Sequence, residues 1–258
     1  MMRVFLEVKK VKNPYLPIEA DQIIPKNFIN HAQEIFVWRG NRKVALEEVF
    51  HKRIEGTASY AKEIEIIISG ESGRIKRIGE YMDAGTIRVQ GDIGMHCGNF
   101  MSGGAIEIGG NSDAWLGREM TGGMIVCHGS AGDYCGSGYR GEKMGMSGGT
   151  IEVFGCAGDF TAEALAGGTV IVHGDAGDLC GAEMTDGTLI IHGNTSRVGG
   201  NMKGGSCTVY GNVIDMLPTF RYIGKMEERG TGATLSEFTG DVANRGMGRL
   251  FVRSYTRA

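Results

Sequence analysis

Apolar and polar residues alternate in short segments that recur at a nearly constant interval through the middle of the chain. Four clear examples are Thr-Ile-Arg-Val at 86–89, Ala-Ile-Glu-Ile at 105–108, Thr-Ile-Glu-Val at 150–153 and Thr-Val-Ile-Val at 169–172. Alternation with period two, rich in β-branched residues, predicts short strands with one buried face. We therefore expect four strands here whose second and fourth residues point inward.

A pair of glycines, or Asp-Gly in one case, precedes the predicted strands at a regular spacing. Measured on the second residue of each pair, the successive steps are 19, 26, 19, 19 and 18 residues. A fixed period of this size predicts a stack of one supersecondary unit. The aligned positions are Gly104, Gly123, Gly149, Gly168, Gly187 and Gly205, with Gly85 one step earlier.

The repeats keep an apolar register. Three residues before each aligned glycine stand Met82, Met101, Met120, Met146, Leu165, Met184 and Met202. Such a column is expected where equivalent positions of successive coils stack in an interior. A flexible glycine-rich linker has no reason to keep this register, so the linker interpretation is rejected.

The repeat predicts an all-β solenoid, a single-stranded β-helix of about seven coils. A hexapeptide helix is excluded because 19 is not a multiple of six, and the Gly-Gly-x-Gly-x-Asp pattern of calcium-binding repeats is absent. Three domains are expected: an α/β N-terminal cap at 1–69, the glycine-rich repeat domain at 70–211 and an extended C-terminal docking tail at 212–258.

The two ends of the chain do not repeat. In the cap we expect strands at Arg3–Val8, Glu34–Trp38 and Glu63–Ser69 and a short helix at Leu46–Ile54. The cap would cover the open end of the solenoid, where strand edges are unpaired.

The C-terminal segment carries an extended run around Phe220, a polar stretch that contains glycine, and the segment Gly246–Val252. From Asn244 onward it has four arginines and no acid. The segment either docks on an acidic surface or is a solvated tail, and Phe220, Arg249 and Arg253 are candidate subunit contacts.

Composition excludes some functional classes. The chain has 258 residues, 41% of them hydrophobic, and a formal charge of −3, so its overall charge gives no reason to expect nucleic-acid binding. No apolar run is long enough to span a membrane, and Met1–Lys12 shows no secretory signal. A cytoplasmic protein is expected.

The six cysteines contain no Cys-x-x-Cys spacing. Three of them, Cys97, Cys135 and Cys180, share one repeat column, which predicts small buried side chains instead of a metal or iron–sulfur ligand set.

Two further columns hold titratable residues. His128, His173 and His192 share the column that follows the strands, where His173 and His192 could share a metal, although Phe154 and Tyr210 in the same column favour a stack of rings. Asp133, Asp159 and Asp178 could resemble a glycosidase acid pair, but aspartate after a corner glycine favours a turn. No catalytic, cofactor-binding or metal-binding residue is therefore assigned.

Two features point outward as candidate subunit contacts. The 26-residue step inserts about seven residues within Gly136–Gly145, which places Tyr139, Arg140 and Lys143 on a projecting loop. The outward strand column becomes apolar at Ile171 and Ile190, and an exposed apolar ridge needs a cover, from the tail or from a partner.

The repeat motif and the flanks resemble the C-subunit of formylmethanofuran dehydrogenase over essentially the whole chain. The motif Gly-x-x-Gly-Asp-x-x-Gly-x-x-Met-x-Gly-Gly-x-Ile-x-Val is visible at 174–191, with Asp186 replacing one glycine. The repeat is also similar to the C-terminal domain of glutamate synthase. Leu217-Pro218-Thr219-Phe220, Phe238-x-Gly-Asp241 and Gly246-x-Gly-Arg-Leu250 favour the dehydrogenase subunit.

The resemblance implies a right-handed β-helix that acts as a non-catalytic scaffold subunit in a methanogenesis complex. That complex reduces carbon dioxide at a tungsten- or molybdenum-pterin site and forms formylmethanofuran at a metal-dependent amidohydrolase site. The implied partners are pterin-type oxidoreductase, amidohydrolase and ferredoxin-like iron–sulfur subunits, which hold the cofactors.

Three alternatives remain open. The chain could be the corresponding subunit of a bacterial formyltransferase/hydrolase complex, a stand-alone glutamate-synthase-type module, or an independent β-helix enzyme that acts on polysaccharide.

Overall fold

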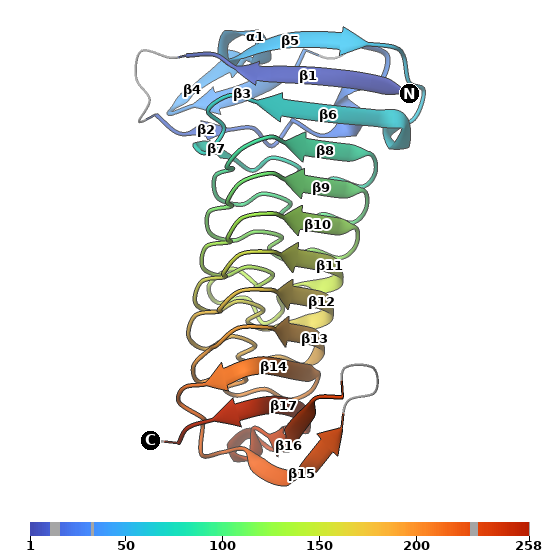
Figure 1. Ribbon diagram of the computed structural model, residues 1–258. Helices are drawn as coiled ribbons and strands as arrows, with labels where there is room; N and C mark the ends of the chain where they lie inside the picture. The colour runs from blue at the N-terminus through green and yellow to red at the C-terminus, as the bar shows by residue number, and fades with distance from the viewer. Residues whose placement is uncertain (11–15, 32–33, 228–231, 258) are drawn as a thin grey trace.

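The chain is built almost wholly of β-structure (Figure 1). The computed structural model describes residues 1–10, 16–31, 34–227 and 232–257. Thirteen strands form one mostly parallel sheet in the order β15-β16-β17-β14-β13-β12-β11-β10-β9-β8-β6-β1-β5, and four form a second sheet in the order β4-β3-β2-β7. The α-helical part of the described chain is one turn, α1 (Leu46–Val49). The predicted all-β class is confirmed at this level.

The repeat units supply the central strands of the large sheet. Each pairs in parallel with the next in register, so that Ile106 lies between Ile87 and Ile125. The four predicted strands are present, and those at 150–153 and 169–172 begin three residues earlier than predicted. The repeat strands are β8 (Thr86–Val89), β9 (Ala105–Ile108), β10 (Met124–Cys127), β11 (Ser147–Val153), β12 (Ala166–Val172), β13 (Asp186–Ile191) and β14 (Ser206–Val213).

The methionine column lies in the core. All seven of its members, from Met82 to Met202, have 0% exposure. Burying an apolar side chain of this size contributes about 1.5–3 kcal/mol relative to leaving it in water. The stack that the spacing predicted is therefore the main apolar interior of the repeat region.

Each glycine of a pair is required for its own reason. A Cβ on Gly122 would lie 2.4 Å from the carbonyl oxygen of Ser102 in the preceding unit, so the two backbones approach too closely for a side chain. Gly123 has a φ of +87°, which is strained for any residue with a Cβ. The pair thus marks the place where one unit lies directly on the previous one.

The N-terminal region continues the same sheet. β1 (Met2–Val8) pairs in parallel with β6 (Ile64–Ser69) and antiparallel with β5 (Phe50–Glu55), and β6 pairs in parallel with β8. The predicted helix at Leu46–Ile54 is wrong beyond Val49, because residues 50–55 form the ladder with β1. The second sheet contains β2 (Ile18–Glu19), β3 (Phe36–Arg39), β4 (Arg42–Ala45) and β7 (Ile75–Lys76), with short 3₁₀ turns η1 (Pro25–His31) and η2 (Ala61–Glu63) beside it.

The C-terminal region adds three strands to the other end of the sheet. They are β15 (Arg221–Glu227), β16 (Thr234–Gly240) and β17 (Gly248–Tyr255), with the 3₁₀ turn η3 (Val242–Asn244) between the last two. β17 pairs in parallel with β14 and antiparallel with β16, so the expected docking tail is a strand of the chain's own sheet. β17 begins two residues into the segment Gly246–Val252 and continues three residues beyond it.

Phe220 is buried in this region at 2% exposure. Its ring lies against Gly240, where a Cβ would come within 2.8 Å of Cδ1. The expectation that Phe220 contacts a partner is therefore wrong for this fold, because the chain's own C-terminal strands cover it. No helix of the described ranges is long and apolar enough to cross a bilayer.

Candidate functional site

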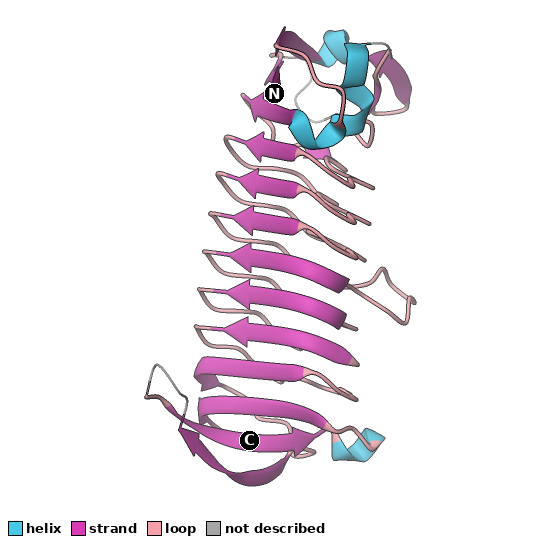
Figure 2. Ribbon diagram, turned by 90° about the vertical axis from the view of Figure 1, so that its right-hand side faces the viewer, coloured by secondary structure: helices cyan, strands magenta, loops and turns pink. Residues whose placement is uncertain are grey.

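A groove of about 800 Å³ lies beside the repeat units, between the inserted loop and η3. Figure 2 shows the loop before β11 and the C-terminal turn η3 projecting from the same side of the stacked units. The groove is lined by the loop residues Tyr139–Lys143, by Glu163 and Glu183 of the next two units, and by Asn201 and Asn244 near the C-terminal end.

The inserted loop leaves and rejoins the stack at one point. Met146 donates its amide hydrogen to the carbonyl of Gly136 at 3.1 Å, which closes the excursion at its base. The Ser137 hydroxyl is fully buried and donates to the Tyr134 carbonyl at 2.8 Å. Because its ends are pinned, the insertion leaves the register of the units on either side unchanged.

Tyr139 folds back toward the N-terminal units. Its ring is tilted against His96 and Trp115, with centroids 6.5 and 5.8 Å away, and the Arg118 guanidinium lies 5.0 Å above it. Its backbone amide donates to Glu119 Oε1 at 3.3 Å. Tyr139 is still 47% exposed, so half of this predicted contact residue stays open to a partner.

The two cations predicted on the loop are exposed. Arg140 approaches the Tyr134 ring at 5.9 Å, and Lys143 lies on the groove wall. Neither makes an ion pair with any residue of the described ranges. Their charges are therefore available in the groove.

A ladder of stacked rings runs beside the groove, and two of its members, Tyr134 and Phe160, line it. His96, Trp115, Tyr134 and Phe160 occupy one position of four successive units, with neighbouring centroids 5.1 Å apart. All four have φ between 56° and 66°, a left-handed conformation that is uncommon for residues with large side chains. Stacking along the column offsets this local cost.

His96 is a neutral base at the upper end of this ladder. Burial, and secondarily the positive charge of Arg118, lowers the pKa of its imidazole to about 4. When the Asn99 amide is oriented to satisfy its neighbours, its oxygen accepts hydrogen bonds from His96 Nδ1 at 3.1 Å and from Arg118 Nε at 3.2 Å. His96 and Arg118, joined through Asn99, are the residues against which Tyr139 of the loop packs.

Besides Glu142 of the loop, two carboxylates of the stacked units, the half-buried Glu163 and the exposed Glu183, line the groove and form what we call its floor. Glu163 and Glu183 come from adjacent units, whose backbones meet where Ala164 donates to the Ala182 carbonyl at 2.7 Å. Burial, and then the charge of Glu183, raises the pKa of Glu163. The sequence did not reveal this pair, because the two residues are 20 positions apart, one more than the repeat, and so share no column.

A second ladder occupies the column that follows the strands. His128, Phe154, His173, His192 and Tyr210 stack with centroids 4.7–5.4 Å apart, which confirms the predicted stack of rings. Glu107 lies 3.2 Å from His128 Nε2, and Glu152 lies 2.8 Å from His173 Nε2. Within the described ranges no cluster of three or more His, Cys, Asp or Glu could hold a metal ion.

The aspartate column is part of the turns. Asp133 Oδ1 accepts the backbone amide of Asp159 at 2.9 Å, and Asp159 Oδ1 accepts that of Asp178 at 2.7 Å. These two carboxylates therefore satisfy backbone donors of the following units, as the turn interpretation predicted. The carboxylate of Asp178 instead accepts from the Arg197 guanidinium.

Five of the six cysteines are buried and all six are free thiols. Burial raises the pKa of Cys180 to about 11 and that of Cys97, Cys135 and Cys207 further still. Such thiols stay protonated and unreactive, in line with the predicted structural role. Cys156 is the exposed exception.

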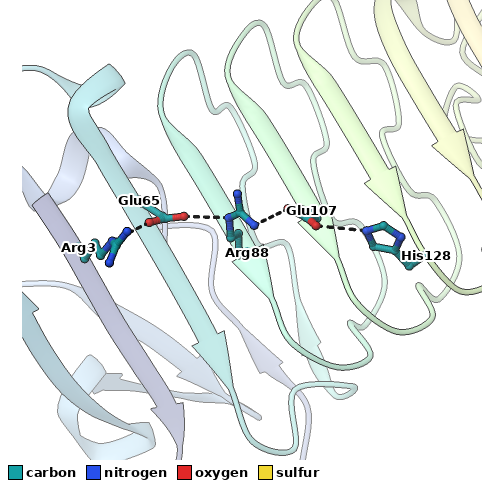
Figure 3. A network of polar contacts seen from close by, with 5 residues as sticks. All are labelled: Arg3, Glu65, Arg88, Glu107 and His128. Atoms are coloured by element: carbon teal, nitrogen blue, oxygen red, sulfur yellow. Dashed lines mark hydrogen bonds and ion pairs between the residues drawn. The ribbon is translucent and has the colours of Figure 1, made fainter. Parts of the chain in front are cut away.

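The outward face of the large sheet carries a chain of ion pairs in its N-terminal half (Figure 3). Glu65 accepts from Arg3 at 3.0 Å and from Arg88 at 2.8 Å, and Glu107 lies 2.9 Å from Arg88 and 3.2 Å from His128. Farther along the same column, Ile171 and Ile190 are half-buried neighbours on β12 and β13. The exposed ridge that was expected there is therefore partly screened by its own sheet.

The two arginines predicted as contacts differ. Arg249 pairs with Glu237 at 2.6 Å and lies 4.9 Å over the Phe251 ring, so its partner is in the same chain. Arg253 is exposed on β17.

No family model matches the chain. Among curated proteins, it is 39% identical over 100 residues to the C-subunit of the molybdenum-containing formylmethanofuran dehydrogenase 1 of Methanosarcina barkeri, a match that covers 37% of this chain and 32% of that one. It is 40% identical over 102 residues to the C-subunit of the tungsten-containing formylmethanofuran dehydrogenase 2 of Methanothermobacter thermautotrophicus, covering 38% and 37%. The matches thus span about a third of the curated relatives.

Among solved structures, a chain of the formyltransferase/hydrolase complex of Methylorubrum extorquens, determined with methylofuran, superimposes with a TM-score of 0.83. It is 25% identical, and the match covers 96% of this chain and 98% of that one. The likeness in structure therefore extends over nearly the whole chain, whereas the likeness to the curated sequences is shorter than predicted. Within these bounds, the predicted resemblance to the C-subunit of formylmethanofuran dehydrogenase is confirmed.

Proposed function

We propose that this chain is a structural subunit of a formylmethanofuran dehydrogenase complex, which reduces carbon dioxide and fixes it on methanofuran. The observation that carries the proposal is the identity of about 40% to the C-subunit of the molybdenum and tungsten enzymes. The chain itself acts as a scaffold, and catalysis takes place in other subunits.

The donor set of this chain supports such a division of labour. Tungsten and molybdenum cofactors and iron–sulfur clusters need thiolate or other convergent ligands. Here the buried cysteines have pKa values raised by burial, and no metal-holding cluster occurs in the described ranges. The described residues do not fit these groups. In the proposed complex, pterin-type oxidoreductase, amidohydrolase and ferredoxin-like partners would hold them.

The scaffold is a right-handed single-stranded β-helix of about seven coils at 70–211, between an N-terminal cap and a C-terminal segment. The parallel in-register strands β8–β14 and the isolated bridges between loops, such as Ser112 with Ala131, support this architecture. The partner contacts are Tyr139, Arg140 and Lys143 on the loop, Ile171 and Ile190 on the sheet, and Arg253. The free cysteines support a cytoplasmic location.

A second candidate is the corresponding subunit of a formyltransferase/hydrolase complex that does not reduce carbon dioxide. The fold match to a chain of the Methylorubrum extorquens complex over 96% of this chain favours it.

Native purification distinguishes the two candidates. The chain is isolated from its source, and the proteins and metals that accompany it are identified by mass spectrometry and metal analysis. A pterin-type oxidoreductase with stoichiometric tungsten or molybdenum supports the dehydrogenase. An amidohydrolase-like subunit and a formyltransferase without these metals support the second complex, and a lone monomer contradicts both.

A further inference from the structure

We propose that the groove between the inserted loop and η3 binds an extended segment of a partner subunit, with a lysine of that segment placed between Glu163 and Glu183. The inference rests on the proposed function, because it requires a partner chain.

The two floor carboxylates lack a countercharge. They project from neighbouring units whose backbones are hydrogen-bonded through Ala164 and Ala182. No residue of the described chain forms an ion pair with either of them. Two like charges on adjacent units repel, and half-burial of Glu163 adds a desolvation cost. A cation between them would remove both penalties, and the compact ammonium of lysine can approach two carboxylates together.

Positive charges flank the pair along the groove. Arg140 and Lys143 lie on the loop side and Lys203 on the side of η3, all lining the groove and all without an ion pair in the described ranges. The loop also brings Glu142 to the groove, so its net contribution is one positive charge. The net charge along the groove is therefore positive at the loop, negative at Glu163 and Glu183, and positive at Lys203. A segment with acidic residues on both sides of its lysine complements this order.

The dimensions suit an extended chain. From the loop unit to the unit of Lys203 there are three steps of the repeat, or roughly 14 Å at the usual strand spacing. An extended peptide rises about 3.3 Å per residue, so about four residues cover this length. The acidic residues of the segment are thus expected about two positions before and after the lysine.

The walls favour a peptide over other ligands. Tyr134, Phe160 and the half-exposed Tyr139 supply apolar surface, and the amides of Asn201 and Asn244 supply hydrogen-bonding groups. Phosphate-bearing ligands would meet the two carboxylates of the floor and be repelled. The chain's own C-terminal strand is held between β14 and β16 and does not occupy the groove.

Carbodiimide coupling of the natively purified complex tests the proposal directly. The reagent joins a carboxylate to an amine only when the two are in ion-pair contact, and mass spectrometry identifies the linked peptides. We expect Glu163 or Glu183 linked to a lysine of another subunit, flanked by acidic residues. Links from these carboxylates only to Lys143 or Lys203 of the same chain, or no link at either of them, would overturn the proposal.

A pair of variants gives a second measurement. Glu163→Gln with Glu183→Gln is expected to weaken association with the remaining subunits about tenfold or more, with a reduced dependence on salt, because a desolvated charge pair is lost. The isolated variant should unfold at the same or a higher temperature, since a repulsion is removed. Glu71→Gln, an exposed glutamate outside the groove, is the matched control and should change neither quantity.

The two proposals fail in different ways. If the wild-type chain purifies without partners, the scaffold function is wrong. If the complex is intact and the double variant binds as tightly as the wild type, only the groove assignment is wrong.

Discussion

The two halves of the outward sheet face differ in the side chains that they present to solvent. In the N-terminal half, Arg3, Glu65, Arg88, Glu107 and His128 form a continuous chain of contacts of 2.8–3.2 Å (Figure 3). It runs across β1, β6, β8 and β9 to the residue that follows β10. In the C-terminal half, the same column holds Ile171, Ile190 and Thr208, which cannot pair electrostatically.

This contrast predicts which half of the face a partner subunit would cover at the lower cost in free energy. A surface whose charges already pair with one another would have to lose those contacts and its hydration to be covered. A surface of half-buried isoleucines loses little on desolvation and gains apolar burial. We therefore expect a partner to dock on the C-terminal half, although both halves have the same backbone.

The largest expected effect comes from breaking the apolar half. Ile171→Asp with Ile190→Asp should weaken association with the partner subunits by about 2–4 kcal/mol, or roughly 30- to 1000-fold, because charges are buried in an apolar contact. Titration of the reconstituted complex measures this effect.

Two further variants serve as controls for the aspartate double variant. Gln90→Asp, exposed on the charged half, should leave association unchanged. Ile171→Thr, which copies Thr208 of the same column, should weaken association while the chain stays folded. Unchanged affinity in the aspartate double variant would show that the isoleucines are not a contact.

Acid should act on the N-terminal units through His96. Its pKa is lowered in the fold to about 4 from an ordinary value near 6.5, so below pH 6.5 the unfolded chain binds a proton that the folded chain does not. Stability is thus fully present above about pH 6.5 and falls as the pH drops toward 4. After allowance for solvent screening of the half-exposed ring, the loss between pH 7 and pH 5 is about 1.5 kcal/mol.

Denaturant unfolding of the wild type and of His96→Phe at the two pH values measures this contribution. The phenylalanine keeps the stack on Trp115 but cannot titrate, so its stability should depend less on pH. Equal pH dependence in both proteins would contradict the assignment.

The smallest expected effect comes from breaking the charged half. Glu65→Gln removes the carboxylate shared by Arg3 and Arg88 and should lower the free energy of unfolding by about 1 kcal/mol, less at high salt because both arginines are half exposed. Thermal unfolding with Glu7→Gln, an exposed glutamate on the same β1 strand as Arg3, serves as the comparison. If Glu65→Gln also weakened association with the partner subunits as much as the isoleucine variants do, the distinction between the two halves would be lost.

The repeat region was predictable because its signals are local and recur. Alternation located β8 and β9 to the residue, and the common spacing placed Met82 through Met202 in one buried column. The stack of His173 on His192 was also predicted, since equivalent positions of neighbouring units must meet. The two ends of the chain do not repeat, so each of their elements had to be predicted from a single local pattern. Phe50–Glu55 pairs with β1 despite its helical pattern, because the ladder competes with local preference.

The groove was not predictable from the pattern. The insertion located the loop, but the return of Tyr139 onto Trp115 depends on contacts between three units. Glu163 and Glu183 line one groove with the loop only because neighbouring units bring them together, and the proposed lysine site depends on that arrangement. The division at 69 and 211 stays a prediction.

The units, their register and their interior can be derived from the chain alone, because each of them follows from spacing and side-chain size repeated seven times. Features that occur once come only from the folded arrangement. In the fold, β17 inserts between β14 and β16, Phe220 is buried, and one groove gathers unpaired charges from the loop and three units. A repeated contact leaves a period in the chain, whereas a contact made once depends on the whole arrangement around it.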